Sequence, residues 1–462
     1  MWKYLALHYG RNTIFMEHTE LDNIESNVAY PYRRINYKMH LLLLTGQILM
    51  ANGAATDQIK RDLFRAAVYM EIPEDKVHSH INYSTLMLTI NDEQHSSHTS
   101  FAKCPAHAVN MSIISAVNQL IWRATKRNYP LEKYEKELLR LKDLRKHYSL
   151  PLETLGAGLI CGGLCKLFGG DLAAGLSTML CGIIGFHVRR LCGIYGFNPY
   201  AGIAISAFVA TFLACIMQFA SISATPIHPM IAATVFLIPG IPLINAVDDM
   251  LEGYLISGIT RAVNTIFTLA SIAFGIIMAL WICGAEDITQ VHIQPDDIYI
   301  SHAFAAILTS IGMSMTFNLP KRFLPIAAIG AVIAVNLRNI LVVQCDANII
   351  AGTFAGAAVV GIMGQIINHW IHAPGSVLTI PSVLPLVPGV LLYRLLYSLL
   401  NISTIEADKL FSCIQNGIEA VTIITAITIG VTIPMLFFRP YLEKYQRKHI
   451  ERLLVSRYLD KN

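Results

Sequence analysis

The chain has 462 residues, of which 54% are hydrophobic and 14% are charged, and its mean hydropathy is +0.49. A soluble protein carries roughly 25% charged residues, so the composition excludes a wholly soluble globular protein. Only nine of the 35 lysines and arginines fall within residues 152–438, and this span is therefore predicted to lie in a membrane.

Residues 1–150 carry as much charge as ordinary soluble protein and are predicted to form a small cytosolic α/β domain. The stretch 1–40 contains no apolar core long enough for a secretory signal, so we expect the N-terminus in the cytosol. Two amphipathic helices are predicted within 33–72, with a turn at Asn52-Gly53 between them. Thr56 is expected to cap the second of these helices.

The rest of the cytosolic domain combines strands and helix. Alternating β-formers and polar residues over 76–103 predict a short hairpin, and 107–147 returns to helix. Four histidines fall in the predicted hairpin and could suggest zinc, but no cysteine or carboxylate has matching spacing, so solvated strand histidines are favoured. These are His78, His80, His95 and His98.

Nine cysteines are scattered singly, mostly within apolar segments, as expected in a reduced compartment where cysteine acts as a small hydrophobe. Cys161 and Cys165 lie four apart on a predicted helix, where small residues at a helix–helix contact are a better interpretation than a metal or redox pair. We therefore expect no metal, no cofactor and no nucleic-acid partner.

From residue 152 onward the chain contains ten apolar segments, each close to the roughly 20 residues that a helix needs to cross about 30 Å of hydrocarbon. They span 154–170, 171–190, 200–222, 228–249, 256–283, 298–318, 323–344, 347–371, 376–400 and 417–438. Lys and Arg in Arg189-Arg190, Lys321-Arg322 and the tail all fall on one side if the N-terminus is cytosolic, which predicts that both termini lie in the cytosol. Lys409 is an exception.

The second half of the membrane span repeats the first at a constant offset in the numbering. The offset that aligns Gly163 with Gly312 also aligns Arg189 with Arg338 and Pro239-Gly240 with Pro388-Gly389. Because each half has five segments, an odd number, the halves must have opposite orientations, an architecture that many secondary transporters use. We therefore predict a mainly α polytopic protein of about ten membrane helices in two inverted five-helix repeats, with boundaries at 1–150, 151–290, 291–440 and a basic cytosolic tail over 441–462.

Both Pro-Gly pairs break the fourth segment of their half. Unsatisfied backbone in hydrocarbon costs several kcal/mol per group, so such a break is stable only where it faces protein or a wet cavity. A broken helix leaves N–H groups and carbonyls that can bind a polar solute. The sequence therefore places a candidate binding site at Pro239, Gly240, Pro388 and Gly389.

Polar residues follow the first break, and we interpret them in different ways. Asp248 and Glu252 are expected to be solvated at the cytosolic end of the segment. Asp249 is expected to face inward, one turn from Asn245 and three turns from Arg261, as an ion partner or proton carrier. Asp171 follows two glycines at the start of the second segment, where it could cap a helix or take part in a gate, and capping is favoured.

Several stretches resemble the threonine/serine exporter family, including two-subunit relatives linked to succinate export. In the first half they are "FGGDLAAG" (168–175), "VRRLCGIYGFNP" (188–199) and "PGIPLINAVDDMLEGYLISGITR" (239–261); in the second, "FNLPKRFL" (317–324), "LRNILV" (337–342) and "PLVPGV" (385–390). The N-terminal "LTGQILMANGAATDQI" (44–59) is similar to that family's cytosolic domain. The resemblance implies transport roles for Pro239, Gly240, Asn245, Asp249, Gly253, Gly258 and Arg261.

The resemblance implies an exporter of small amino acids such as threonine and serine in the cytoplasmic (inner) membrane, coupled to protons. In the second repeat, Arg394 occupies the position that corresponds to Asn245. Arg394 in one half and Asp249 in the other could therefore supply opposite charges around a zwitterion. An alternative cargo is a dicarboxylate such as succinate, for which Arg189 and Arg338 form a symmetric pair, although both lie near segment ends where snorkelling is favoured. A third interpretation is a membrane-bound enzyme, but the N-terminal domain contains no nucleophile elbow, P-loop or spaced metal set. Homo-oligomer formation stays open.

Overall fold

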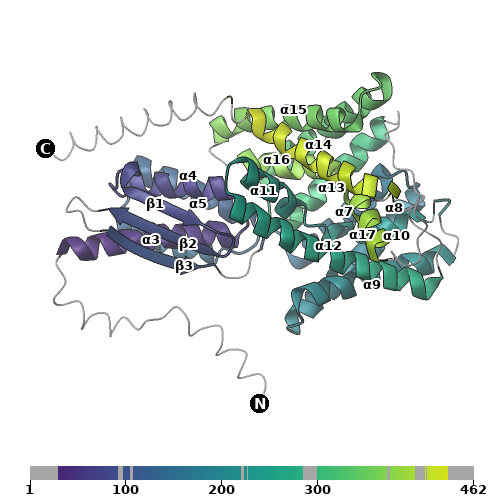
Figure 1. The fold of residues 1–462 in the computed structure, drawn as a ribbon, viewed down its shortest axis with the longest axis horizontal. Coiled ribbons are helices and arrows are strands. Elements are labelled where there is room, and N and C mark those ends of the chain that lie inside the picture. The colour runs from purple at the N-terminus through teal and green to yellow at the C-terminus, as the bar shows by residue number, and fades with distance from the viewer. Residues whose placement is uncertain are drawn as a thin grey trace, which may run out of the picture.

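The computed structural model describes residues 30–91, 97–104, 108–219, 223–225, 227–284, 299–371, 375–400, 411–412, 414–434 and 437. These residues form two parts that lie side by side in Figure 1. The N-terminal module comprises the elements α3 to α6 together with a small sheet, and the helical bundle comprises the elements from α7 onward.

The module begins with two helices, as predicted: α3 (Tyr30–Ala51) and α4 (Thr56–Tyr69). The turn between them depends on Gly53, whose φ of +84° is readily adopted only by glycine. The prediction that Thr56 caps α4 is wrong. Ala55 occupies the N-cap position without a side-chain hydrogen bond, and the Thr56 hydroxyl contacts the helical bundle instead.

The predicted hairpin is a three-stranded antiparallel sheet in the order β1-β2-β3. After a short 3-10 turn, η2 (Glu74–Lys76), the strands are β1 (Val77–Ile81), β2 (Thr85–Asn91) and β3 (Ser97–Lys103). Val77 pairs with Ile90, and Leu88 pairs with Ser100. The sequence pattern missed the break between β1 and β2. The side chains of His78 and His80 are exposed on β1, while His95 falls outside the described residues.

The helix expected over 107–147 is two helices, α5 (Met111–Arg127) and α6 (Leu131–Lys142). Asn128 ends α5 in the left-handed conformation with a φ of +46°, and Pro130 stands before α6. This Asn-x-Pro sequence ends one helix and starts the next, because proline cannot continue a hydrogen-bonded helix but suits the position before a new one.

The helical bundle contains helices at all ten predicted segments. In the first half they are α7 (Leu150–Leu167), α8 (Leu172–Ile194), α9 (Pro199–Phe219), α10 (Ile227–Ala232) with η3 (Val235–Leu237), α11 (Gly240–Leu251) and α12 (Leu255–Cys283). In the second half they are α13 (Tyr299–Thr316), η5 (Lys321–Phe323) with α14 (Leu324–Gln344), α15 (Ile349–Ile371), α16 (Gly375–Val383) with η6 (Leu384–Leu386), α17 (Gly389–Leu400) and a helix over Ile414–Pro434.

Seven of these helices in the described chain are long and apolar enough to cross a membrane, and the count becomes eight when one bent pair is included. The bent pair joins Ile227–Leu237 to Gly240–Leu251 at an angle of 60°, which confirms that Pro239-Gly240 breaks its segment. The full number of ten crossings stays a prediction, since α13 and the short helix over Gly375–Leu386 do not meet both criteria.

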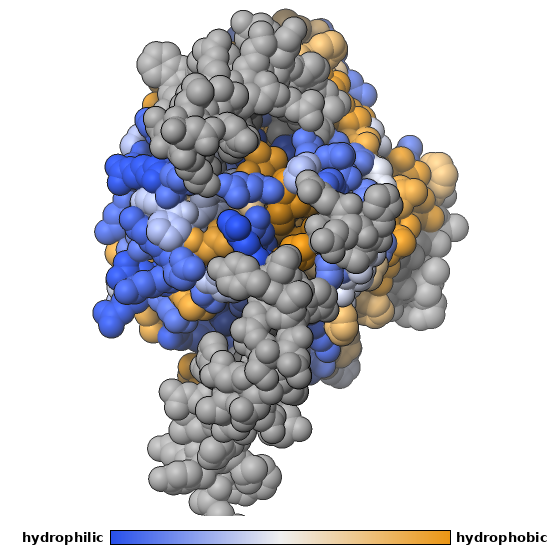
Figure 2. All heavy atoms as spheres, turned by 90° about the vertical axis from the view of Figure 1, so that its left-hand side faces the viewer, coloured by the Kyte–Doolittle hydropathy of each residue, from blue (hydrophilic) through white to orange (hydrophobic). Residues whose placement is uncertain are grey.

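Figure 2, viewed from the module's end, shows hydrophilic side chains over much of that face.

The bounds of three elements recur at the offset found in the sequence. The helix α13 begins and ends at the residues that the offset aligns with the first and last residues of α7. The same holds for η6 with η3 and for α17 with α11. The helices α7 and α13 pack closely and antiparallel. A β-carbon added to Gly163 would lie 2.8 Å from the Ala305 carbonyl oxygen, and one added to Gly156 would lie 3.0 Å from that of Gly312.

The two broken segments contact each other. A β-carbon on Gly240 would collide with the Leu384 side chain, and one on Gly389 would collide with that of Ile238. Gly240, Leu384 and Gly389 are all buried, so the breaks face protein. The broken segments of the two halves therefore contact each other inside the bundle.

We expect Gly163→Leu to destabilise the folded chain by about 1–3 kcal/mol, the usual cost of forcing extra carbons into a well-packed core. The added side chain has no room against α13. Gly193→Leu is the matched control, because a β-carbon there meets nothing within 4 Å. Thermal unfolding of both variants in detergent tests this, and equal melting temperatures would contradict the tight α7–α13 contact.

Candidate functional site

The carboxylate of Asp249 lies at the centre of the contact between the module and the bundle. Its side chain is 1% exposed, near the end of α11. One oxygen accepts a hydrogen bond from the Thr56 N–H at 3.0 Å, and the other accepts one from the Thr56 hydroxyl at 2.9 Å. The Arg261 Nε lies 2.8 Å from the second oxygen and forms an ion pair with it. Asp249 therefore joins a helix of the module to α12 of the bundle.

A tight corner between α11 and α12 brings Arg261 to Asp249. Gly253 adopts a φ of +85°, and the Tyr254 N–H donates to the Asp249 carbonyl at 2.7 Å, which turns the chain back on itself. A β-carbon on Gly258 would lie 2.8 Å from the Ala246 carbonyl oxygen, so glycine allows the two helices to approach. Arg261, predicted to lie three helical turns from Asp249, therefore contacts it directly.

The turn that links α3 to α4 supplies two further bonds to the site. The Asn245 side-chain amide donates to the Gly53 carbonyl at 3.1 Å, and Arg261 donates to the Ala54 carbonyl at 3.0 Å. Asn245 and Arg261 are 3% and 7% exposed. Three of the predicted site residues, Asn245, Asp249 and Arg261, thus converge on the short turn of the module that runs from Gly53 to Thr56.

The electrostatics of this contact are nearly balanced. The first N–H groups of α4 have no partners within the helix and carry the positive end of its dipole, so a carboxylate there is stabilised. The Asp249 carboxylate lies at this N-terminus of α4 although Asp249 belongs to α11, and Arg261 neutralises its charge. The Tyr83 ring covers Arg261, with 5.5 Å between Cζ and the ring centroid. Burial raises the pKa of the Tyr83 phenol, and Arg261 opposes this shift.

The module is also anchored to the second half of the bundle. The Met111 and Ser112 N–H groups donate to the Phe317 and Asn318 carbonyls at 3.0 and 3.1 Å, and the Asn318 amide donates to Asn110 at 2.9 Å. Ser376 at the start of α16 donates to the Gln58 side chain at 3.0 Å. The module therefore contacts both halves of the bundle on one side.

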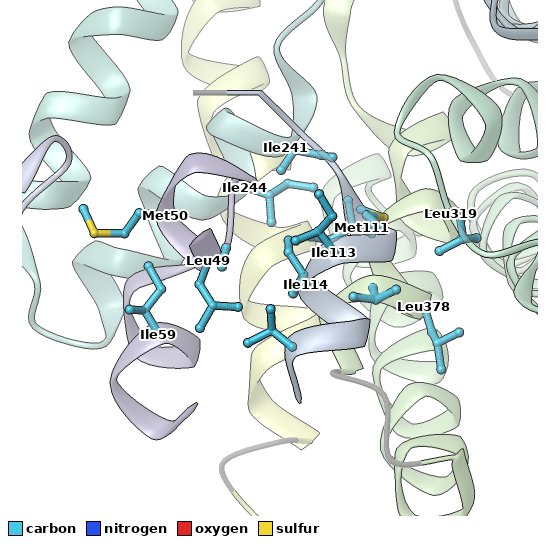
Figure 3. Packing of buried hydrophobic residues seen from close by; sticks show 14 of the residues in the cluster. Leu49, Met50, Ile59, Met111, Ile113, Ile114, Ile241, Ile244, Leu319 and Leu378 are labelled. Atoms are coloured by element: carbon cyan, nitrogen blue, oxygen red, sulfur yellow. The ribbon is translucent and has the colours of Figure 1, made fainter. Parts of the chain in front are cut away.

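Apolar packing completes the contact between module and bundle. Figure 3 shows module residues and bundle residues in one cluster, and all of those labelled are buried. From the module come Leu49, Met50, Ile59, Met111, Ile113 and Ile114, and from the bundle come Ile241, Ile244, Leu319 and Leu378. The module and the bundle thus share one hydrophobic core.

A small pocket that is partly open to solvent lies at this junction. Its wall is mostly apolar, with Asn245, Gln58 and Ser376 as the polar side chains. Ile241 follows the first Pro-Gly break directly, so the pocket adjoins the broken helix. The turn at Gly53–Ala55 forms one side of it.

The remaining predicted site residues lie elsewhere. Asp171 caps α8, accepting from the Ala174 N–H at 2.6 Å, and it also accepts from the Ser223 hydroxyl and the Ala224 N–H. The preference for capping is confirmed. Arg394 is buried on α17, and in the described chain the cation paired with Asp249 is Arg261 rather than Arg394.

Asp248 is not solvated as predicted: it accepts from the Thr432 hydroxyl at 3.0 Å and so connects α11 to the last described helix.

Sequence reasoning missed two polar features. Thr56 is a direct partner of Asp249, and the only signal for it was that its stretch, 44–59, resembled the same family as the membrane segments. On the second half, a ring nitrogen of buried His302 in α13 lies 2.9 Å from the Asn339 amide nitrogen, and the Asn339 amide oxygen accepts from Arg338 at 3.0 Å. An isolated histidine in an apolar segment gives no spacing that predicts its partner.

Comparison with known proteins places this geometry in a family. Residues 40–283 match the family described as "Putative threonine/serine exporter", and residues 302–437 match "Threonine/Serine exporter, ThrE". The chain is 31% identical over 237 residues to "Probable succinate transporter subunit YjjP" of Klebsiella aerogenes, covering 51% of this chain and 88% of the relative. It is also 31% identical over 250 residues to the protein of the same name from Escherichia coli K12, covering 53% of this chain and 94% of that relative. No solved structure matches the chain.

The first family description accounts for the module and the first half of the bundle, and the second accounts for the second half. The two matched regions, which together run from residue 40 to residue 437, include the turn at Gly53, the broken helices and the α11–α12 corner. The chain is a multi-pass membrane transporter that belongs to the threonine/serine exporter family, with both of the family's parts fused in one polypeptide.

Proposed function

We propose that this protein exports small amino acids such as threonine and serine across the cytoplasmic membrane, driven by protons, and that it is not an enzyme. The observation that carries the proposal is the convergence of Asn245, Asp249 and Arg261 beside a broken helix. These side chains offer an anion, a cation and an amide within one buried site. A zwitterionic amino acid carries a carboxylate and an ammonium, and these three side chains offer a partner for each.

The cargo would bind with its carboxylate at Arg261 and Asn245 and its ammonium at Asp249. The site itself has no net charge, since Asp249 and Arg261 balance each other. A zwitterion therefore enters without leaving a buried charge uncompensated, which would cost several kcal/mol.

Transport would proceed by movement of two inverted repeats about the paired breaks. The recurrence of helix bounds at the repeat offset, the antiparallel α7–α13 contact and the meeting of Gly240 with Leu384 and of Gly389 with Ile238 all support this architecture. Rocking of one repeat against the other would open the breaks alternately to each side of the membrane.

The module contacts support a cytosolic position for both termini. The end of α11, the end of α13 and the start of α16 all touch the module. If the module is cytosolic, as its composition and the distribution of Lys and Arg indicate, those three points lie at the cytosolic face. Asn198 then faces the cytosol, and the loop at Cys345, which joins α14 to α15, faces the outside.

A dicarboxylate such as succinate is the second candidate cargo, because both relatives named above are called succinate transporter subunits. It would need two cationic contacts. Arg189 is exposed at the end of α8, while Arg338 donates to Asn339 inside the second half. The arrangement around Asp249 favours an amino acid, since a carboxylate repels a dianion.

Asp249→Asn and Asn245→Ala should each lower threonine efflux by roughly tenfold or more, because each removes a hydrogen-bonding group that is buried with the cargo. Cells preloaded with a threonine dipeptide and separately with succinate, with and without an uncoupler, provide the measurement. A fall in threonine efflux on addition of the uncoupler would support proton coupling.

Glu252→Gln is the matched control, because it removes a neighbouring acid at the C-cap of α11 that is not one of the predicted site residues. Its efflux should stay at the level of the unmodified protein. Unchanged efflux of every tested solute in Asp249→Asn would show that the assignment of Asp249 is wrong. Efflux of succinate and not of threonine would favour the second candidate.

The proposed topology predicts that Cys345, which is exposed, reacts with a membrane-impermeant maleimide in intact cells. A cysteine introduced at exposed Asn198 should react only after the membrane is permeabilised. Cys345→Ser provides the background for both measurements. Labelling of residue 198 in intact cells would contradict the inverted arrangement.

A further inference from the structure

The turn over Gly53–Thr56 presents to the bundle the same groups that a small hydroxylated amino acid presents. Thr56 offers an N–H and a β-hydroxyl, and both donate to the Asp249 carboxylate, at 3.0 and 2.9 Å. In free threonine the α-ammonium and the β-hydroxyl have the same spacing along the carbon chain. One carboxylate can therefore accept from either pair of donors.

The other end of the turn resembles the other end of the amino acid. The Gly53 and Ala54 carbonyl oxygens accept from Asn245 and Arg261, at 3.1 and 3.0 Å. Two oxygens that accept from an amide and a guanidinium are what a carboxylate would provide at the same side chains. Each of the three site residues thus forms at least one hydrogen bond with an atom of the module.

We propose that the Gly53–Thr56 turn is an internal pseudosubstrate, which occupies the cargo site in this docked form and is displaced by a β-hydroxy amino acid. This inference rests on the proposed function. It adds that the module is an autoinhibitory element whose turn competes with the proposed threonine or serine cargo for the same three side chains. Succinate has neither an ammonium nor a hydroxyl to replace the Thr56 donors.

The docked turn would set a concentration threshold for export. A group tethered to its own binding site competes at an effective concentration of about millimolar for short flexible connections, so cargo at lower concentration leaves the turn in place. Export would then begin only when the amino acid accumulates in the cytosol.

The second anchor allows the turn to leave without loss of the module. The bonds from Met111 and Ser112 to Phe317 and Asn318 involve α5 and the loop before α14, and none of them uses the turn or its partners. The module can therefore remain attached to the second half of the bundle while the first half exchanges the turn for cargo.

Hydrogen exchange of the full-length protein in detergent tests the displacement directly, because the Thr56 N–H is itself the donor to Asp249. We expect L-threonine at saturating concentration to speed exchange in a peptide covering 53–59, whereas succinate does not. Exchange of a peptide covering 111–118 at the second anchor should not change. Exchange that speeds up with succinate and not with threonine would overturn the assigned cargo class.

Thr56→Val keeps the size of the side chain and removes the hydroxyl, so it weakens the pseudosubstrate and leaves the cargo site intact. We expect the half-saturating threonine concentration for efflux to fall by roughly fivefold to tenfold, the effect of one hydrogen bond to a charged group. Thr99→Val, on the exposed face of β3, is the matched control and should not change it.

The outcomes separate this inference from the proposed function. If threonine is exported and Asp249→Asn abolishes the export, yet threonine leaves exchange at 53–59 unchanged, the pseudosubstrate is overturned and the exporter stands. If neither threonine nor serine is exported by the unmodified protein, the proposed function fails, and this inference fails with it.

Discussion

A buried carboxylate shared between a helix N-terminus and an arginine holds the two parts of this protein together. Asp249 is 1% exposed, and in water-free surroundings its charge would cost several kcal/mol without compensation. Thr56 supplies two donors and Arg261 supplies a positive charge. Removal of any one of the three leaves the others partly unsatisfied, so the docking of the Gly53–Thr56 turn against the first half of the bundle depends on this one contact. The same dependence makes it suitable as a switch.

Close approach of backbone governs the rest of the bundle. Gly156, Gly163 and Gly312 allow α7 and α13 to pack without intervening side chains, while Gly240 and Gly389 give the two breaks room for Leu384 and Ile238. Because the hydrophobic effect does not drive helices together within lipid, such close packing and interhelical hydrogen bonds provide much of the free energy of helix association. The contacts of α7 with α13 and of one break with the other join the two halves, so the interface between halves is where movement during transport would occur.

The sequence predicted what depends on local pattern and failed where partners come from distant parts of the chain. The ten apolar segments and the two breaks follow from hydrophobic length and from Pro-Gly, and the structure has helices at each segment. Thr56 was expected to cap its own helix because Ser and Thr do so in most local contexts. Its hydroxyl instead bonds Asp249, in the fourth membrane segment, and no spacing rule foresees that. Asp248 was expected to be solvated because it lies at the end of its segment, yet Thr432 bonds it. Both Arg261 and Arg394 were proposed to act with Asp249, and the turn at Gly253 brings Arg261 to it. Spacing alone does not show which of the two arginines reaches the carboxylate.

A double-mutant cycle between Thr56 and Asp249 tests the central claim most directly. The free energy of unfolding is measured for the unmodified chain, Thr56→Val, Asp249→Asn and the double variant in the same mixed micelles. Direct bonding predicts a coupling energy of about 1 kcal/mol or more, the size typical of contacting residues in one hydrogen-bond network. Effects of the two substitutions that add within about 0.5 kcal/mol would contradict the account, because they would show that the Thr56 hydroxyl and the Asp249 carboxylate do not hold the module and the bundle together.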